Sequence, residues 1–138
     1  MRLLFLSHGR FSEEICKTAE LIIGKLPEDA KYLCLPAGID LDEYRINIEK
    51  EIAEGQKDDG ILILIDLYGG TPFMITSRVL GEYQDKSKVG IVTGLNLPMV
   101  LETVLQKERL SLSDLTELAY QSGKQGIHNF TKEIERLD

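Results

Sequence analysis

The most constraining feature of this sequence is a run of five apolar residues at positions 61–65, with no polar residue among them. A strand with one face in water alternates apolar and polar residues, whereas a strand buried on both faces is apolar throughout. Burial on both faces is typical of a parallel sheet that helices cover from both sides. The run therefore predicts a central strand of such a sheet.

Strand-like and helix-like periods alternate along the rest of the chain. In the first helical segment, apolar residues recur at three- and four-residue steps from Phe11 to Leu26. This alternation predicts a doubly wound α/β fold with an open sheet of four parallel strands and helices on both faces. Strands are expected at residues 2–6, 31–35, 61–65 and 89–93, a helix is expected after each, and a last helix at residues 113–122.

Turn and cap signals refine these boundaries. Pro72 stands where a first helical residue is expected, so Thr71 before it is a candidate N-cap. The last helix is expected to end at Ser122, before the glycine-containing stretch 123–126. Residues 127–131 are a short segment whose pattern is ambiguous and only weakly strand-like.

Length, charge and cysteine content limit the function classes. A chain of 138 residues suits a single domain, residues 1–138, that buries roughly 70% of its unfolded surface. A net charge of −7 argues against nucleic acid as a partner. Cys16 and Cys34 lack metal-ligand spacing, which indicates a reducing compartment. No apolar run approaches the ~20 residues of a membrane span, so we expect a cytoplasmic protein without direct membrane insertion.

Two polar side chains follow strands that are expected to lie in the middle of the sheet. His8 follows the first strand, and Asp66 follows the third. Ligands of open parallel sheets bind beyond the carboxyl ends of the strands, where helix N-termini also expose free N–H groups. A carboxylate that accepts one imidazole N–H leaves the other ring nitrogen free as a nucleophile. The pair therefore predicts a phosphoryl-accepting histidine oriented by Asp66.

Each of these residues also has a plain structural reading. His8 and Asp66 could be turn or cap residues. Gly69 and Gly70 could satisfy backbone conformations with positive φ, and Arg10 could be a solvated surface charge. His128, in the polar terminal segment, is expected to be structural or merely exposed.

Three motifs in this order resemble a known family. They are Ser-His-Gly at residues 7–9, Asp-Leu-Tyr-Gly-Gly-Thr-Pro-Phe at residues 66–73, and Gly-Leu-Asn-Leu-Pro-Met at residues 94–99. Together they resemble the mannose-family EIIA component of the bacterial phosphoenolpyruvate:sugar phosphotransferase system (PTS). The resemblance implies that His8 accepts a phosphoryl group from HPr and passes it to an EIIB protein, with Asp66 against the histidine. The predicted phosphoryl-binding residues are Gly9, Arg10, Gly69, Gly70 and Thr71.

The resemblance also has implications for assembly. It implies a homodimer in which residues 127–131 pair antiparallel with the partner's sheet. It implies a separate EIIB polypeptide, because the chain ends after a charged tail at Asp138, and an indirect link to the membrane components EIIC and EIID. We expect no metal and no cofactor. The sequence does not name the sugar.

Three other functions remain open at this point. In a receiver-like protein, Asp66 itself would take the phosphoryl group with Mg²⁺, but Ser7-His8 stands where such a site needs an acidic pair. A nucleotide- or flavin-binding module is disfavoured, since no glycine-rich phosphate-binding motif follows any strand. A non-catalytic regulatory or ligand-binding module of the same fold is the main alternative.

Overall fold

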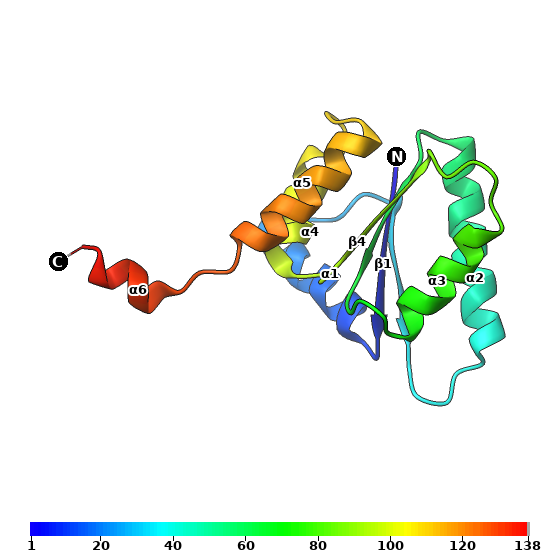
Figure 1. The fold of residues 1–138 in the computed structure, drawn as a ribbon, viewed down its shortest axis with the longest axis horizontal. Helices are drawn as coiled ribbons and strands as arrows, with labels where there is room; N and C mark the ends of the chain where they lie inside the picture. Colours follow the sequence, from blue (N-terminus) through cyan, green and yellow to red (C-terminus); the bar gives the residue numbers. More distant parts are fainter. Residues whose placement is uncertain (138) are drawn as a thin grey trace.

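The computed structural model describes residues 1–137 and contains one four-stranded sheet (Figure 1). Its strands, all parallel, are β1 (Arg2–His8), β2 (Ala30–Leu35), β3 (Ile61–Ile65) and β4 (Val89–Thr93), in the order β2-β1-β3-β4. The predicted fold class is confirmed. The bounds of β3 and β4 match the prediction, and β1 runs two residues further, to His8.

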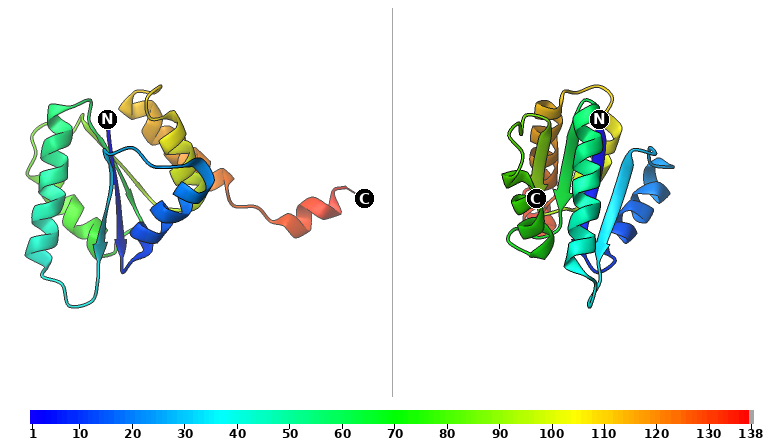
Figure 2. Two further views of the ribbon diagram at one scale, coloured as in Figure 1. Left: turned by 180° about the vertical axis from the view of Figure 1, so that it is seen from behind. Right: turned by 90° about the vertical axis from the view of Figure 1, so that its right-hand side faces the viewer.

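Helices cover both faces of the sheet (Figure 2). On one face, α1 (Phe11–Ile23), α4 (Leu97–Gln106) and α5 (Leu112–Gln125) enclose an apolar core with Leu3, Phe5, Leu62 and Leu64 of the sheet. On the other face, α2 (Leu41–Lys57) and α3 (Thr71–Gly81) enclose a second core with the alternate residues of the same strands. All five residues of β3 are fully buried, as the uninterrupted apolar run predicts.

The strand order sets where a ligand can bind. From β1 the chain crosses to β2 on one side, and from β3 it crosses to β4 on the other side. The connections therefore diverge between β1 and β3, which leaves a crevice beyond the carboxyl ends of these two strands. Open α/β sheets bind ligands at such a switch point.

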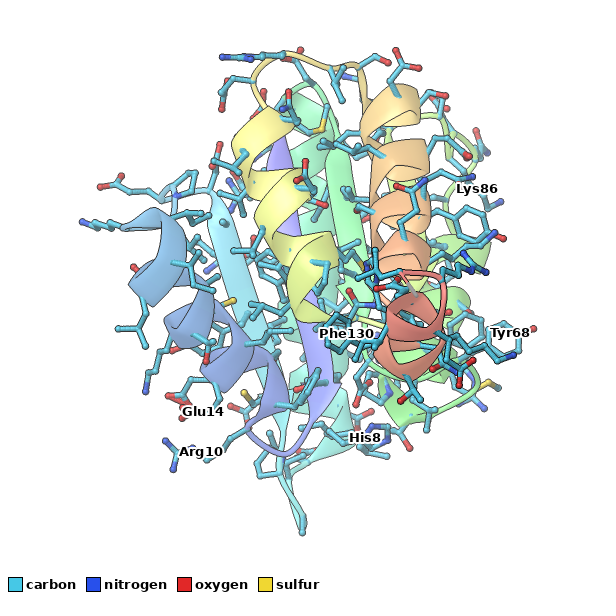
Figure 3. The ribbon with its side chains drawn as sticks, turned by 90° about the vertical axis from the view of Figure 1, so that its left-hand side faces the viewer. His8, Arg10, Glu14, Tyr68, Lys86 and Phe130 are labelled. Carbon is cyan, nitrogen blue, oxygen red and sulfur yellow. The ribbon has the colours of Figure 1, made fainter. Side chains whose placement is uncertain are left out.

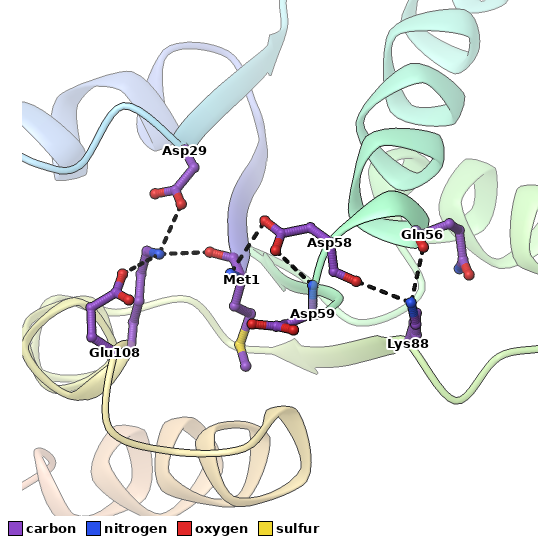
Figure 4. Close-up of polar contacts among 8 residues, drawn as sticks. Met1, Asp29, Gln56, Asp58, Asp59, Lys88 and Glu108 are labelled. Carbon is purple, nitrogen blue, oxygen red and sulfur yellow. Dashed lines mark hydrogen bonds and ion pairs between the residues drawn. The ribbon is translucent and has the colours of Figure 1, made fainter.

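The opposite, amino end of the sheet is tied by buried polar contacts (Figure 4). The Lys107 ammonium donates to the Met1 carbonyl at 2.6 Å, to Glu108 at 2.8 Å and to Asp29 at 2.9 Å, with its side chain 1% exposed. Burial alone would lower the pKa of Lys107, but the bonds to Glu108 and Asp29 outweigh it and raise that pKa. Three satisfied donors make this buried charge tolerable, so the contacts serve the fold.

The last long helix differs from its predicted extent. We expected it to end at Ser122, but α5 continues to Gln125 and contains Gly123. A Cβ at Gly123 would come within 2.6 Å of the Met99 side chain, and the Gly123 carbonyl accepts a hydrogen bond from the Asn96 side chain at 3.1 Å. Glycine is poor in a helix by itself, but here it lets α5 approach α4 closely.

The C-terminal segment also differs from the prediction. In the single chain, residues 127–129 have no regular secondary structure, and a short helix, α6 (Phe130–Glu135), replaces the expected strand at residues 127–131. The segment extends away from the sheet (Figure 1). Exchange of this segment with a second copy stays a prediction. Within residues 1–137, no helix is both long and apolar enough to span a membrane.

Candidate functional site

His8 and Asp66 meet at the switch point between β1 and β3. His8 is the last residue of β1, and Asp66 directly follows β3. The Asp66 Oδ2 atom lies 2.8 Å from His8 Nδ1 and also accepts the His8 backbone N–H at 3.0 Å. One carboxylate oxygen therefore contacts both the ring and the backbone of His8, which limits how the imidazole can turn.

The two side chains of this pair differ in exposure. The His8 side chain is 45% exposed, whereas that of Asp66 is 15% exposed. The second oxygen, Asp66 Oδ1, is buried and has no hydrogen-bond partner within residues 1–137. Burial, with a smaller effect of the Asp66 charge, raises the pKa of the phenol of Tyr44, which donates to the Leu33 carbonyl. Asp66 therefore contacts His8 through Oδ2 alone, while the His8 ring remains accessible from solvent.

The amino end of α3 lies against the imidazole. Gly70 is the N-cap of α3, and a Cβ there would come within 2.6 Å of His8 Cε1 and 3.2 Å of His8 Nε2. Thr71, which we expected to cap this helix, is instead its first residue, and no side chain caps the first turn. The N–H groups at a helix start have no intrahelical acceptor, and Pro72 has no N–H. The amides of Thr71 and Phe73, in the first turn of the helix whose N-cap lies beside the ring, therefore have no intrahelical acceptor.

Ser7 provides a hydrogen-bond acceptor at the start of α1, a role that the sequence alone did not predict. Its fully buried hydroxyl accepts the Ser12 N–H at 2.7 Å. The N-cap residue Arg10 makes no side-chain cap bond, so Ser7 supplies the acceptor that α1 lacks. The connecting Gly9 has φ +54, a conformation that favours glycine, and donates to the Leu35 carbonyl at 2.8 Å. A serine just before the histidine is the signal that could have found this contact.

Arg10 lies near His8 in the chain but points away from it (Figure 3). Its guanidinium contacts Glu14 at 3.0 Å and Glu13 at 3.5 Å, and the side chain is 71% exposed. The predicted phosphoryl ligand is thus held by its own helix. Of the other predicted residues, Gly69 has φ +79 and provides the turn before Gly70. His128 is exposed and pairs with Glu133 in the C-terminal segment.

The third motif serves the fold in this structure. The Asn96 side chain accepts the Met99 N–H at 3.1 Å as the N-cap of α4, and its amide donates to α5. These bonds satisfy the polar atoms of Asn96 and join two helices on one face of the sheet.

Exposed apolar side chains surround the carboxyl edge. Leu67 and Tyr68, in the loop after β3, are 58% and 75% exposed. Phe11 at the start of α1 and Met74 in α3 are 47% and 44% exposed. The Tyr68 ring packs on Phe73 at a centroid distance of 4.8 Å, which supports the loop. We call Phe11, Leu67, Tyr68 and Met74 the apolar rim.

The described residues offer no other clear chemistry at this edge. Residues 1–137 contain no group of three or more histidine, cysteine, aspartate or glutamate side chains arranged to hold a metal ion. Burial raises the pKa of the Cys16 thiol to about 12, so it stays protonated at neutral pH. The fold and the site therefore define a doubly wound α/β domain with an aspartate-oriented histidine at its switch point.

The comparisons with known proteins identify the family. The family described as "PTS system fructose IIA component" matches residues 2–120. The chain belongs to this family of EIIA components, which are parts of sugar phosphotransferase systems.

Individual relatives agree with this assignment. A solved PTS component EIIA from Streptococcus agalactiae is 32% identical, with a TM-score of 0.85 over 95% of this chain and 98% of that one. The mannose/sorbose specific IIA subunit from Enterococcus faecalis is 27% identical, with a TM-score of 0.78 over 93% and 92%. The mannose-specific EIIAB component of Escherichia coli K12 is 29% identical over 88% of this chain, and the match spans 36% of that relative's length.

Proposed function

We propose that this chain is a cytoplasmic phosphocarrier: His8 accepts a phosphoryl group from phospho-HPr and passes it to a separate EIIB protein, which drives uptake and phosphorylation of a sugar. The observation that carries the proposal is the 2.8 Å contact between His8 Nδ1 and Asp66 at the switch point of an EIIA-family fold. The names of the relatives support a mannose-type sugar system and leave the sugar open.

The proposal gives the two ring nitrogens of His8 different roles. Asp66 is acceptor-only when ionised, so the proton between the two residues sits on Nδ1. His8 Nε2 then carries the free electron pair and is the nucleophile. As Nε2 forms its bond to phosphorus, the bond from phosphorus to the donor's leaving atom breaks, and Asp66 stabilises the cationic ring. No proton needs to leave Nε2 for this step.

The surroundings of Nε2 suit a phosphoryl group. The amides of Thr71 and Phe73 at the start of α3 are free to donate to phosphoryl oxygens, and the Thr71 hydroxyl is a further donor. The charge of a transferring phosphoryl group spreads over its oxygens, so preplaced donors and alignment supply most of the help that a protein can give. Gly9 and Gly69 shape the two turns that bring these helix starts to His8.

Arg10 must leave its glutamate partners before it can bind a phosphoryl group at His8. It is engaged by Glu13 and Glu14, and a protein that docks at this edge can compete for it. The apolar rim offers a surface for this docking, because exposed apolar side chains with polar residues around them are a common feature of protein–protein contacts. HPr and EIIB must use the same edge in turn, since both have to reach Nε2.

The homodimer remains part of the proposal. Ile127 is 79% exposed and Phe130 is 67% exposed, on a segment that extends from the body of the chain. A second copy could cover these side chains, and the sedimentation mass of the protein will decide between monomer and dimer.

The proposal predicts two transfers. The chain is phosphorylated with phosphoenolpyruvate, enzyme I and HPr, separated from the donors, and mixed with an EIIB protein of the mannose type. We expect the label to move to EIIB at a rate that depends on EIIB concentration. Label that stays on the chain with an EIIB shown to accept phosphoryl groups from another EIIA would contradict the carrier role and favour a regulatory module.

A further inference from the structure

The second glycine of the Gly69-Gly70 pair is not explained by its backbone. Gly69 has φ +79, which side-chain-bearing residues rarely adopt. Gly70 has φ −74 and ψ 175, an extended conformation that any residue can adopt. As the N-cap of α3, position 70 would ordinarily favour serine, threonine, aspartate or asparagine. Something other than the turn therefore requires glycine at position 70.

The imidazole of His8 occupies the space that a side chain at position 70 would need. An ideal Cβ on Gly70 would lie 2.6 Å from His8 Cε1 and 3.2 Å from His8 Nε2. The first distance is shorter than van der Waals contact allows, so the two groups cannot both be present in this arrangement. The third nearest atom, the Leu67 carbonyl oxygen, would be at 3.4 Å, which is an ordinary contact.

The ring is thus fixed from two directions. Asp66 contacts Nδ1, and Cε1 and Nε2 lie beside the position that a Cβ on Gly70 would occupy. We propose that Gly70 is a positioning residue: its missing side chain makes the room in which the His8 imidazole bonds Asp66 and at the same time places Nε2 against the amino end of α3. This inference rests on the proposed role of His8 as the phosphoryl acceptor and deepens it.

The structure also indicates which group moves when a methyl is added. The clashing atoms are the far end of a side chain that is 45% exposed, whereas the Gly70 backbone is held by its bonds to Leu67 and Met74. In Gly70→Ala the ring therefore swings toward solvent and loses the Asp66 contact, while the fold is kept. A displacement of about 1 Å at a reacting atom can cost ~10²-fold in rate. We expect a loss of this size in phosphoryl transfer.

Gly81 provides the matched control. It is the last residue of α3, has no positive φ, and no atom lies within 4 Å of a Cβ built on it. Gly81→Ala makes the same chemical change in the same helix without contact to His8. Gly70→Ser is a second test variant, because it adds a favoured N-cap and the same clash.

The experiment measures both position and rate. Two-bond ¹H–¹⁵N spectra report the tautomer of His8, and rapid-quench assays report transfer from phospho-HPr. We expect wild type and Gly81→Ala to keep the proton on Nδ1 and to transfer at one rate. Both Gly70 variants should lose the single-tautomer signal and slow about 10²-fold, with melting temperatures close to that of wild type.

The outcomes separate this inference from the proposed function. Unchanged ring signals in both Gly70 variants would overturn it even if transfer slowed, since the added group would then act by blocking the approach of the donor. Transfer at the wild-type rate would overturn it as well. If wild type itself takes no phosphoryl group from active donors, the proposed function fails, and the ring spectra alone still decide whether Gly70 positions His8.

Discussion

Replacement of Asp66 by asparagine tests how the carboxylate acts on His8. The oxygen that contacts His8 Nδ1 at 2.8 Å also accepts the His8 backbone N–H at 3.0 Å. An asparagine that placed its NH₂ group there would face this backbone donor. We therefore expect the amide oxygen to take the place of Oδ2 and the NH₂ to take that of Oδ1, where no partner in the described chain opposes it.

The magnitude follows from this orientation. A hydrogen bond to a charged acceptor contributes ~1.5–3 kcal/mol and one to a neutral acceptor ~0.5–1.5, a difference of about 1–1.5 kcal/mol. The His8 side chain is 45% exposed, so solvent screening reduces the difference to about 1 kcal/mol. Since ~1.4 kcal/mol is a factor of ten, we expect Asp66→Asn to slow transfer from phospho-HPr about fivefold.

The alternative orientation makes a different prediction. If the NH₂ group faced Nδ1, the ring proton would move to Nε2 and the nucleophile would be lost, which costs ~10⁴-fold in a protease triad. Rapid-quench measurement of Asp66→Asn beside Asp66→Ala distinguishes the two, because alanine removes the acceptor and should cost more than asparagine. A loss above about 10³-fold in Asp66→Asn, or no loss at all, would refute this reasoning.

Two predictions concern the fold. Burial raises the pKa of the Cys16 thiol to about 12, so a thiol reagent at pH 8 should modify Cys16 in urea but not in the folded protein. Mass mapping of the modified residues tests this, and modification of Cys16 under both conditions would contradict its burial. Lys107→Met leaves Asp29 and the Met1 carbonyl without their donor, but Asp29 is 34% exposed, so urea unfolding should show a loss of about 1–3 kcal/mol. A smaller loss than that of a surface substitution such as Lys132→Met would mean that the ammonium is not needed.

The positions of the strands, and the burial of residues 61–65 on both faces, could be predicted because they depend on the local pattern of apolar residues. Residues 61–65 are apolar throughout, and the structure has strands with the predicted bounds at 61–65 and at 89–93. His8 and Asp66 could be paired because parallel strands bring their carboxyl ends to one edge, and the contact at 2.8 Å agrees with that prediction. Their catalytic roles stay predictions.

Two of the three misplaced features depend on tertiary contacts. Glycine at position 123 normally indicates a helix end, but here it lets α4 and α5 pack closely. Threonine is a favoured N-cap residue, which led to the prediction for Thr71. In the structure the N-cap is Gly70, and the ring of His8 lies beside it. Arg10 was placed near the site by sequence, whereas the glutamates one helical turn further on hold it away. The contacts of Gly123 with Met99 and of Gly70 with His8 are not visible in a local sequence pattern, whereas the pairs of Arg10 with Glu13 and Glu14 follow the local i,i+3 and i,i+4 spacing of a helix.

The most direct test of the account is the intact mass of the protein after incubation with phosphoenolpyruvate, enzyme I and HPr. The chain has two histidines, so His128→Ala is the natural control for His8→Ala. We predict one acid-labile phosphoryl group on wild type and on His128→Ala, and none on His8→Ala. A phosphoryl group on His8→Ala, or none on wild type with donors shown to be active, would contradict the claim that His8 carries the phosphoryl group.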